Sequence, residues 1–334
     1  MKAFQVLNHA HPSQISVSQD VPTPIPAPDQ VLVDVYAAGL NFFDILQAQG
    51  KYQTQPPLPF VLGAEFAGRI SAHSPIPKGC RWRPGDRVFG YAQGSFAEVV
   101  AVGWKGLLGM PAVLGFEEAA GVSLTYTTSY EGLVGRGAAK KGDWVLVHAG
   151  AGGVGLAACQ IAKVLGCKVI ATASTEEKRR VCRDRGGVDE VVDYTQADWQ
   201  KEVMRITGGK GVDVVFDPVG MIVPSLKCIA WNGRLVVVGF AGGTIEKIPA
   251  NLLLLKNVSA TGLFWGATAT KDPPRVAKVV KEVLGLIASG KLVPQVYDPV
   301  YVGLEEVPKG LQELEGRKTW GKAVVRIRED RAKL

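Results

Sequence analysis

One segment constrains the fold of this chain more than any other. The strand-like run WVLVHA is followed at once by the glycine loop GAGGVG and then by an apolar helical pattern. The glycines have the spacing Gly-x-Gly-x-x-Gly, as Gly150, Gly152 and Gly155, and a second strand-like run follows from Lys168 to Ala173. Strand, glycine loop, helix and strand in this order predict a βαβ unit whose loop approaches a phosphate-bearing ligand.

Each part of this loop has a physical reason to bind a dinucleotide. The first glycine is expected to make the tight turn, the second to let the backbone approach a pyrophosphate, and the third to let helix and strand pack closely. The helix N-terminus adds backbone N–H groups and a partial positive charge. The alternative is that the loop is only a tight turn. The expected cofactor contacts are Gly150, Gly152, Gly153, Val154 and Gly155.

The residues after the second strand indicate which nicotinamide cofactor fits. An NAD enzyme places Asp or Glu there, about 20 residues beyond the loop, to bind the ribose 2′-hydroxyl. This chain has Thr172, Ala173 and Ser174 there, and Lys178 follows shortly after. A hydroxyl and an ammonium would bind a 2′-phosphate, which a carboxylate would repel. We therefore expect NADPH, held through Ser174 and Lys178, unless Lys178 belongs only to a solvated helix face.

The hydrophobic pattern divides the chain into two kinds of structure. Up to about residue 110, short strands such as 31–37 and 96–102 are broken by Gly and Pro, which predicts a β-rich domain. From about residue 124, apolar strands alternate with helices, which predicts a doubly wound parallel sheet of the α/β class. The tail returns to short strands, so the α/β unit is expected to be inserted into the β-rich domain. The strands expected in the parallel sheet lie at 144–149, 168–173, 190–192, 212–216, 234–240 and 258–263.

Composition and charge narrow the function classes. The 334 residues are 47% hydrophobic and 21% charged, as in an ordinary globular protein. Lys and Arg exceed Asp and Glu by 38 − 31 = 7, but the charges are scattered, which favours a solvated surface over a nucleic-acid patch. The five cysteines form no Cys-x-x-Cys pair, and the four histidines form no metal-binding doublet. Without an apolar run like that of a signal peptide or a membrane span, we expect a cytoplasmic protein.

Several motifs together resemble a known family. They are AAGLNFFD (37–44), GKYQTQPPLPFVLGAEFAG (50–68), RPGDRVFG (83–90), GSFAE (94–98), TYTTSYEGL (125–133), HAGAGGVG (148–155) and WGKAVV (320–325). In these motifs the chain resembles the zinc-free medium-chain dehydrogenases/reductases of the zeta-crystallin, or quinone oxidoreductase, type. The resemblance implies a GroES-like catalytic domain from residues 1–124 and 267–334 around a Rossmann domain from residues 125–266. It also implies a homodimer joined through the edge strand near Val258 to Leu263.

The resemblance bears on the metal as well. Zinc-bearing relatives place Cys where Leu40 or Asn41 stands in this chain, and His where Ala64 stands. They also carry a four-cysteine lobe that has no counterpart here. An amide and a methyl group do not replace the thiolate and imidazole ligands of Zn²⁺. We therefore expect no metal in this protein.

The resemblance further implies which residues line the site. Asn41 and Tyr52 match residues near the nicotinamide, so we expect an amide donor from Asn41 and a substrate contact or proton donor from Tyr52. The alternatives are a turn-forming asparagine and a core aromatic. Asp44 is expected in the first turn of a helix, where the helix dipole favours a carboxylate. The other implied cofactor contacts are Thr128, Tyr194, Phe240, Ala241, Phe264, Trp265, Gly266 and Lys322.

The expected reaction is hydride transfer from NADPH to an acceptor that needs no Lewis acid. A quinone or a conjugated enone accepts hydride because its charge delocalises onto oxygen, so orientation and hydrogen bonding supply most of the catalysis. A second enzyme class, an enoyl-CoA or acryloyl-CoA reductase, remains open. So does a non-catalytic, crystallin-like or RNA-binding role, although RNA binding would need a basic groove with stacking aromatic residues.

Overall fold

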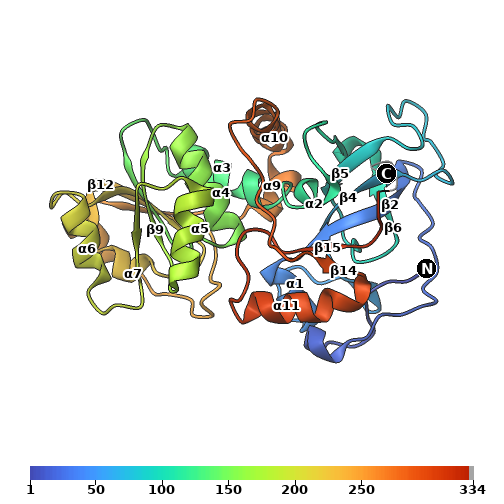
Figure 1. Cartoon of the computed structure of the whole chain (residues 1–334), viewed down its shortest axis with the longest axis horizontal. Helices are drawn as coiled ribbons and strands as arrows, with labels where there is room; N and C mark the ends of the chain where they lie inside the picture. Colours follow the sequence, from blue (N-terminus) through green and yellow to red (C-terminus); the bar gives the residue numbers. More distant parts are fainter. Residues whose placement is uncertain (331–334) are drawn as a thin grey trace. The chain divides into compact units, whose positions relative to one another are not determined.

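The computed structural model describes residues 1–330, which form two compact units (Figure 1). The first unit consists of Met1–Leu124 together with the chain from Val296 onward. The second unit is the segment Thr125–Gln295 between them. The second unit is therefore an insertion within the first.

The second boundary differs from the expected one at residue 267. Helices α9 (Trp265–Lys271) and α10 (Pro273–Ala288) belong to the second unit. Val279, Val283 and Ile287 are buried along α10, and the helix packs on α3 (Thr125–Tyr130). An apolar stripe of this spacing must be covered, and α3 of the second unit covers it. The chain returns to the first unit only after Gln295.

Six parallel strands form the sheet of the second unit, so the predicted doubly wound sheet is confirmed. Their order, β10-β9-β8-β11-β12-β13, is the 3-2-1-4-5-6 order of a Rossmann fold. The chain reverses its direction of winding between β8 and β11, and ligands of such sheets bind there, outside the carboxyl ends of the strands. The strands are β8 (Trp144–Val147), β9 (Lys168–Thr172), β10 (Glu190–Val192), β11 (Val212–Asp217), β12 (Ile229–Val237) and β13 (Ser259–Gly262).

A buried layer of side chains crosses this sheet. Ile170, Leu146, Val215 and Leu235 lie in register on four neighbouring strands, and each is fully buried. Helices α4 and α5 pack on each other and on β9 (Figure 1). Besides α3, α9 and α10, the helical segments are the π-helix η3 (Glu131–Arg136), α4 (Gly153–Val164), α5 (Glu176–Gly186), α6 (Trp199–Ile206), α7 (Ile222–Ser225) and α8 (Ala250–Lys256).

The first unit is a β-rich domain, as predicted. Its larger sheet has the order β14-β15-β2-β4-β5-β7, and β6 also pairs with β2. The central strand β2 therefore binds strands from both ends of the chain. The expected short strands of the tail are β14 and β15. The strands are β1 (Gln5–Val6), β2 (Gln30–Gly39), β3 (Phe60–Val61), β4 (Glu65–Ile70), β5 (Arg87–Tyr91), β6 (Val99–Gly103), β7 (Leu108–Gly109), β14 (Tyr301–Val302) and β15 (Val324–Arg326).

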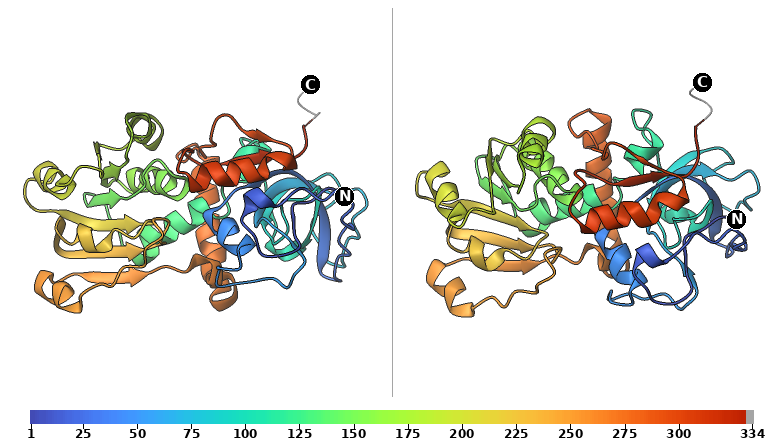
Figure 2. Two further views of the ribbon diagram at one scale, coloured as in Figure 1. Left: turned by 90° about the horizontal axis from the view of Figure 1, so that it is seen from below. Right: turned by 60° about the horizontal axis from the view of Figure 1, so that its bottom comes forward.

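Two helices from opposite ends of the chain lie side by side in the first unit. They are α1 (Phe42–Ala48) and α11 (Val307–Glu315), seen in Figures 1 and 2. Ile45 and Ala48 of α1 and Leu311 of α11 belong to one buried cluster. Residues near both termini therefore hold the start of α1 in place. The remaining helical segments are η1 (Pro12–Gln14), η2 (Trp104–Gly106), α2 (Phe116–Ala119) and η4 (Leu304–Glu306).

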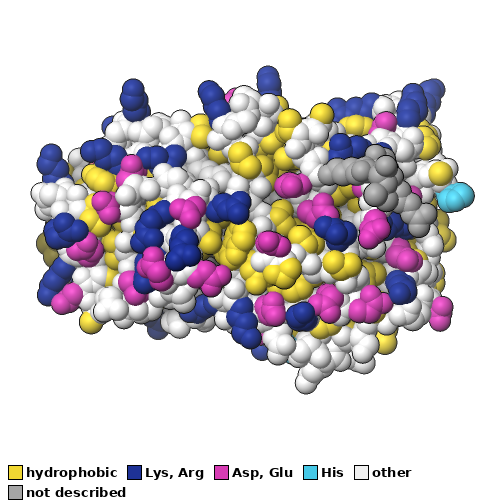
Figure 3. Space-filling view, in the orientation of Figure 1, with side chains coloured by type: hydrophobic (Ala, Val, Ile, Leu, Met, Phe, Trp, Pro, Cys, Tyr) yellow, Lys and Arg dark blue, Asp and Glu magenta, His cyan; other side chains and the backbone are white. Residues whose placement is uncertain are grey.

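Within residues 1–330, no helix has both the length and the apolar character that crossing a membrane requires. On the face drawn in Figure 3, basic and acidic side chains are interspersed. Several basic residues are paired, as in Lys163–Asp189 and Arg234–Asp143, whose N–O distances are each 2.7 Å. Mixed charge of this kind produces no field of a single sign on that face.

The glycine loop supplies a stability prediction. A Cβ at Gly155 would lie 2.1 Å from the carbonyl oxygen of Ala149, so we expect Gly155→Ala to lower the free energy of unfolding by about 2 kcal/mol through overpacking. The matched control is Gly285→Ala in α10, where no heavy atom of the described chain lies within 4 Å. That change should stabilise the protein by about 1 kcal/mol. Urea unfolding of both variants measures the difference, and a Gly155→Ala variant as stable as the wild type would contradict the close packing.

Candidate functional site

The glycine loop joins β8 to α4, and its glycines are needed for different reasons. Ala149 has a φ of 48°, so this alanine adopts the left-handed conformation of the turn. A Cβ at Gly150 would lie 2.6 Å from the Cβ of Ala171 on β9. Gly150 lies within this turn, which the Gly152 N–H closes by donating to the Ala149 carbonyl oxygen at 2.8 Å. Gly150 also clears the neighbouring strand, and Gly155 clears the carbonyl of Ala149.

The second glycine of the loop has a single close backbone neighbour. Within the described chain, only the carbonyl oxygen of Ala149 would lie within 4 Å of a Cβ at Gly152, at 3.3 Å. Gly152 is also the N-cap of α4, and no side chain caps the helix there. The first-turn residues Gly153 and Val154 follow directly. An uncapped N-terminus with room beside it fits a pyrophosphate group, as the sequence predicts.

Helix α3 is anchored to the first turn of α4. The Ser129 hydroxyl lies 2.7 Å from the carbonyl oxygen of Val154 and 2.8 Å from that of Thr125. Thr128 is the neighbouring residue on α3 and is buried. Thr128 therefore lies close to the glycine loop, because the next residue, Ser129, binds the first turn of α4.

The remaining cofactor candidates of the second unit follow the carboxyl ends of other strands. Because the strands are parallel, these ends meet at one edge of the sheet. Phe240 and Phe264 are partly exposed there, at 36% and 56%. Trp265 and Gly266 begin α9. The residues that the topology gathers at this edge are Ser174 after β9, Tyr194 after β10, Phe240 and Ala241 after β12, and Phe264, Trp265 and Gly266 after β13.

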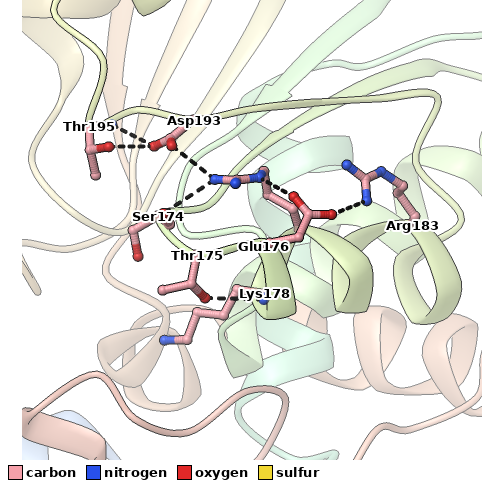
Figure 4. A network of polar contacts seen from close by, with 8 residues as sticks. Ser174, Thr175, Glu176, Lys178, Arg183, Asp193 and Thr195 are labelled. Carbon is pink, nitrogen blue, oxygen red and sulfur yellow. Dashed lines mark hydrogen bonds and ion pairs between the residues drawn. The ribbon is translucent and has the colours of Figure 1, made fainter.

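A polar network covers the ends of β9 and β10 (Figure 4). Arg179 donates hydrogen bonds to Asp193 Oδ2 at 2.9 Å, to Glu176 Oε2 at 2.9 Å and to the Ser174 carbonyl oxygen at 3.2 Å. Hydrogen bonds from Thr195, followed by the charge of Arg179, hold the pKa of the Asp193 carboxyl below its usual range. The Asp193 carboxyl therefore remains ionised and is paired with a cation.

The Lys178 side chain extends away from the acidic residues of this network (Figure 4). Thr175 is the N-cap of α5, and its hydroxyl accepts the backbone N–H of Lys178 at 3.3 Å. In Figure 4 the Lys178 amine points away from Glu176 and Asp193. The sequence identified Ser174 and Lys178 but missed the Arg179–Asp193 pair, because the two residues meet only when β9 and β10 are aligned.

In the first unit, Asn41 belongs to a buried polar cluster with Glu65 and Lys322. The Asn41 amide donates to Glu65 Oε1 at 3.0 Å and to the carbonyl oxygen of Gly39 at 3.2 Å. Its oxygen accepts from Lys322 Nζ at 2.6 Å, and Lys322 also forms an ion pair with Glu65. Glu65 Oε2 accepts the Leu124 N–H at 3.1 Å. Both side-chain N–H groups of Asn41 therefore donate to acceptors of the first unit.

Two glycines make room for the lysine. A Cβ at Gly39 would lie 2.7 Å from Lys322 Cε and 2.8 Å from Glu65 Oε1, and a Cβ at Gly121 would lie 2.8 Å from Lys322 Cγ. Lys322 reaches Asn41 because β15 pairs with β2 just beyond it. The sequence treated Lys322 as a cofactor contact, whereas the structure places its ammonium in a buried ion pair of the first unit.

Asp44 lies in the first turn of α1, as predicted, and is fully buried. Its Oδ2 accepts the backbone N–H of Asn41 at 2.8 Å. Burial raises the pKa of this carboxyl to about 8, an effect that the Asn41 hydrogen bond and the charge of Lys322 oppose and the charge of Glu65 reinforces. Asp44 is therefore protonated at neutral pH, which the sequence did not indicate.

Tyr52 follows α1 and is half-buried, with its ring stacked on Phe43 at a centroid distance of 5.2 Å. Burial, and next the charge of Asp44, raise the pKa of its phenol. Tyr91 of β5 is a second phenol in this region, and sequence reasoning missed it. Burial, then Tyr52, Asp44 and Glu65, raise the pKa of Tyr91 to about 12.

The positions where zinc-bearing relatives carry ligands have apolar or amide side chains. Leu40 and Ala64 are buried, and Asn41 is held by the cluster described above. Across residues 1–330, no three His, Cys, Asp or Glu side chains gather closely enough to hold a metal ion. At these positions the chain therefore provides the hydrogen bonds of Asn41 and the ion pair between Lys322 and Glu65, not metal ligands.

His148 at the end of β8 is another buried polar residue. Its ring nitrogens lie 3.1 Å from Thr172 Oγ1 and 2.8 Å from Ser225 Oγ. Burial lowers the pKa of the imidazole, so the ring is neutral and joins β8 to β9 and α7. Its role is therefore to fix the strand ends that carry the cofactor candidates.

Comparisons with known proteins span both units. Residues 27–112 match the family model of the alcohol dehydrogenase GroES-like domain, and residues 153–284 match that of the zinc-binding dehydrogenases. The quinone oxidoreductase-like protein 2 homolog of Nematostella vectensis is 39% identical over 90% of this chain and 82% of that protein. The quinone oxidoreductase of Homo sapiens is 33% identical over 76% of this chain and 77% of that protein.

A solved structure shares the whole architecture. The Escherichia coli quinone oxidoreductase complexed with NADPH matches with a TM-score of 0.88 at 31% identity, covering 98% of this chain and 100% of that one. The regions matched by the family models include Gly153 and Gly155 in the second unit and Asn41 and Glu65 in the first. This chain is therefore an oxidoreductase of the quinone oxidoreductase family of medium-chain dehydrogenases/reductases.

Proposed function

We propose that this protein reduces a quinone or a conjugated enone with NADPH, without a metal. The observation that carries the proposal is the Asn41–Glu65–Lys322 cluster, which lies beside Leu40 and Ala64, where zinc-bearing relatives carry metal ligands and this chain has none. In zinc-bearing relatives the metal acts there as a Lewis acid on the developing charge, whereas a quinone or an enone delocalises much of that charge itself. Related quinone oxidoreductases support this choice of acceptor.

NADPH is the cofactor that the second unit fits, and an NADPH complex is known for a relative. The uncapped start of α4, with Gly152, Gly153 and Val154, would hold the pyrophosphate. Ser174 and Lys178 would hold the 2′-phosphate, because Arg179 already pairs with the nearby carboxylate of Asp193. The other contacts proposed are Thr128, Gly150, Gly155, Tyr194, Phe240, Ala241, Phe264, Trp265 and Gly266.

In the first unit, we assign the acceptor contact to Tyr52 and a supporting role to Asn41. When bound, NADPH supplies the hydride. Tyr52 would donate a hydrogen bond to the acceptor oxygen, since its raised pKa keeps the phenol protonated. Because both N–H groups of Asn41 are engaged, a direct bond to the acceptor would require one of them to be exchanged. Lys322 binds both Asn41 and Glu65, so its positive charge would act on the acceptor through these two side chains.

The cofactor assignment predicts a selective effect at Lys178. We expect Lys178→Ala to weaken NADPH binding about 10-fold and to leave NADH binding nearly unchanged, because a charge-assisted hydrogen bond to the 2′-phosphate is lost. The matched control is Arg180→Ala, an exposed residue on the same helix, which should change neither affinity. Fluorescence titration with both cofactors measures this, and equal weakening of NADPH and NADH would refute the role of Lys178.

The acceptor assignment predicts the outcome of an NADPH-oxidation screen over quinones, enals and enoyl-CoAs. We expect turnover with quinones or enones and a loss of kcat of roughly 100-fold in Tyr52→Phe, the range expected when a general acid is removed. Asn41→Ala should also lower kcat, because Lys322 loses its hydrogen bond to Asn41 and is displaced. Turnover of acyl-CoA substrates alone would favour the second enzyme class, and no turnover of any acceptor would favour a non-catalytic role such as RNA binding.

We also propose that the protein is a cytoplasmic homodimer. All five cysteines are unpaired and buried, which fits a reducing compartment. Strand β13 lies at the end of the parallel sheet, and such an edge must be covered. Beside it, Leu254 and Leu255 on α8 are 78% and 70% exposed. A second copy pairing near Val258 to Leu263 would cover both the edge and these side chains.

The proposed dimer predicts that charged residues at Leu254 and Leu255 prevent association. Replacing both Leu254 and Leu255 with Glu should shift the protein to a monomer, because the carboxylates would be desolvated on association. Light scattering coupled to size-exclusion chromatography gives the molar mass. The control is Ile25→Glu, at an exposed site in the first unit, which should leave the mass unchanged. A double variant with the mass of the wild type would argue against this interface.

A further inference from the structure

Two buried acceptors on α1 have no donor. Asp44 Oδ1 and Gln47 Oε1 have no hydrogen-bond partner among residues 1–330, although both side chains are buried. The residues are three apart on a helix, so they lie on the same face. A buried acceptor without a donor is destabilising. If Asp44 carries a proton, one of these two acceptors becomes a donor.

The charges of the cluster point to the same protonation state. It contains one cation, Lys322, and two carboxyl groups, Glu65 and Asp44. The ammonium of Lys322 is bound by Glu65 and Asn41, while Asp44 Oδ2 accepts only the neutral backbone N–H of Asn41. A second buried anion without its own cation is strongly disfavoured. The proton then belongs on Oδ1, because Oδ2 is already an acceptor.

We propose that Asp44 stores the proton that completes the reduction and that Tyr52 passes it to the acceptor. This inference rests on the proposed function, since it concerns the second half of the same reaction. Asp44 acts through Tyr52 because the carboxyl is fully buried and the phenol is partly exposed.

Two contacts hold the segment of Tyr52 against α1. The ring of Tyr52 stacks on Phe43, the residue before Asp44. Gln47 Nε2 donates to the carbonyl oxygen of Thr54 at 3.3 Å and to Gln93 Oε1 at 3.1 Å. Gln47 thus binds Thr54 to the helix face of the two buried acceptors, and the Tyr52 phenol lies close enough for the charge of Asp44 to raise its pKa.

The step balances in atoms and charge. Hydride supplied by bound NADPH leaves the reduced quinone or enone as an oxyanion that lacks one proton. The Tyr52 O–H bond breaks as an O–H bond forms on that oxyanion, and Tyr52 takes the proton of Asp44. The Asp44 carboxylate that remains is protonated again from solvent. No oxidant or further reductant is needed.

The pH dependence follows from the direction of the shift. The groups that act on Asp44 are Asn41 and Lys322, which favour the anion, and Glu65, which disfavours it; Tyr52 and Tyr91 are the phenols in its field. Because the pKa in the folded protein is raised to about 8, the proton is present below that pH and is lost above it. Turnover should therefore fall as the pH rises through about 8.

The matched variant is Asp44→Asn. The amide oxygen of asparagine still accepts the Asn41 N–H, so the start of α1 keeps its hydrogen bond, but the side chain holds no transferable proton. We expect kcat to fall roughly 100-fold, the alkaline fall in rate near pH 8 to disappear, and the solvent deuterium isotope effect to change. Tyr91→Phe should retain the pH dependence of the wild type.

A direct readout needs no turnover. Infrared spectra of protein labelled with ¹³C-aspartate should show a buried carboxylic-acid band at pH 7 that declines as the pH rises through about 8 and is absent from Asp44→Asn. If that variant does not fold, the titration of the labelled wild type decides the matter, because a missing acid band at pH 7 overturns the inference.

The outcomes separate the two proposals. A wild type that reduces quinones but whose Asp44→Asn variant keeps the alkaline fall in rate overturns the inference alone. A wild type that oxidises NADPH with no quinone or enone overturns the proposed function and this role together. Loss of the pH dependence in Tyr91→Phe, with Tyr52→Phe unaffected, overturns the assignment of Tyr52.

Discussion

The buried ion pair between Lys322 and Glu65 is the interaction on which the first unit depends. Removing two charges from water is costly, and such a pair is tolerated only when its other hydrogen-bonding positions are satisfied. Asn41 and the Leu124 N–H satisfy them, and the missing side chains of Gly39 and Gly121 leave the space. The pairing of β15 with β2 brings the lysine from the far end of the chain.

This ion pair also explains the state of its neighbour. Burial disfavours the anion of Asp44, and Lys322, which binds Glu65 and Asn41, only partly offsets this, so the carboxyl stays neutral although it lies at a helix N-terminus that would favour its anion. A purely structural arrangement thereby produces a chemical property, a carboxylic acid that holds its proton at neutral pH. Buried polar clusters frequently supply perturbed pKa values in this way at the sites of enzymes.

In the second unit, the alignment of parallel strands brings the candidate cofactor residues together. Six parallel strands end at one edge, so segments separated by more than a hundred residues, such as the glycine loop and Phe264, are gathered there without specific contacts between them. At the same edge Arg179 pairs with Asp193. An acidic residue that would disfavour a 2′-phosphate is thus neutralised by the network around it.

The sequence by itself determined the two kinds of structure, the glycine loop, the parallel sheet and the absence of a carboxylate after β9, because periodicity and local spacing encode these features. It misplaced the boundary at residue 267. Only the tertiary structure decided that Lys322 is buried beside Asn41, that Arg179 meets Asp193 and that Asp44 is protonated. Burial and pairing between residues far apart in the chain set these properties, and no local pattern records which charges will share one low-dielectric space.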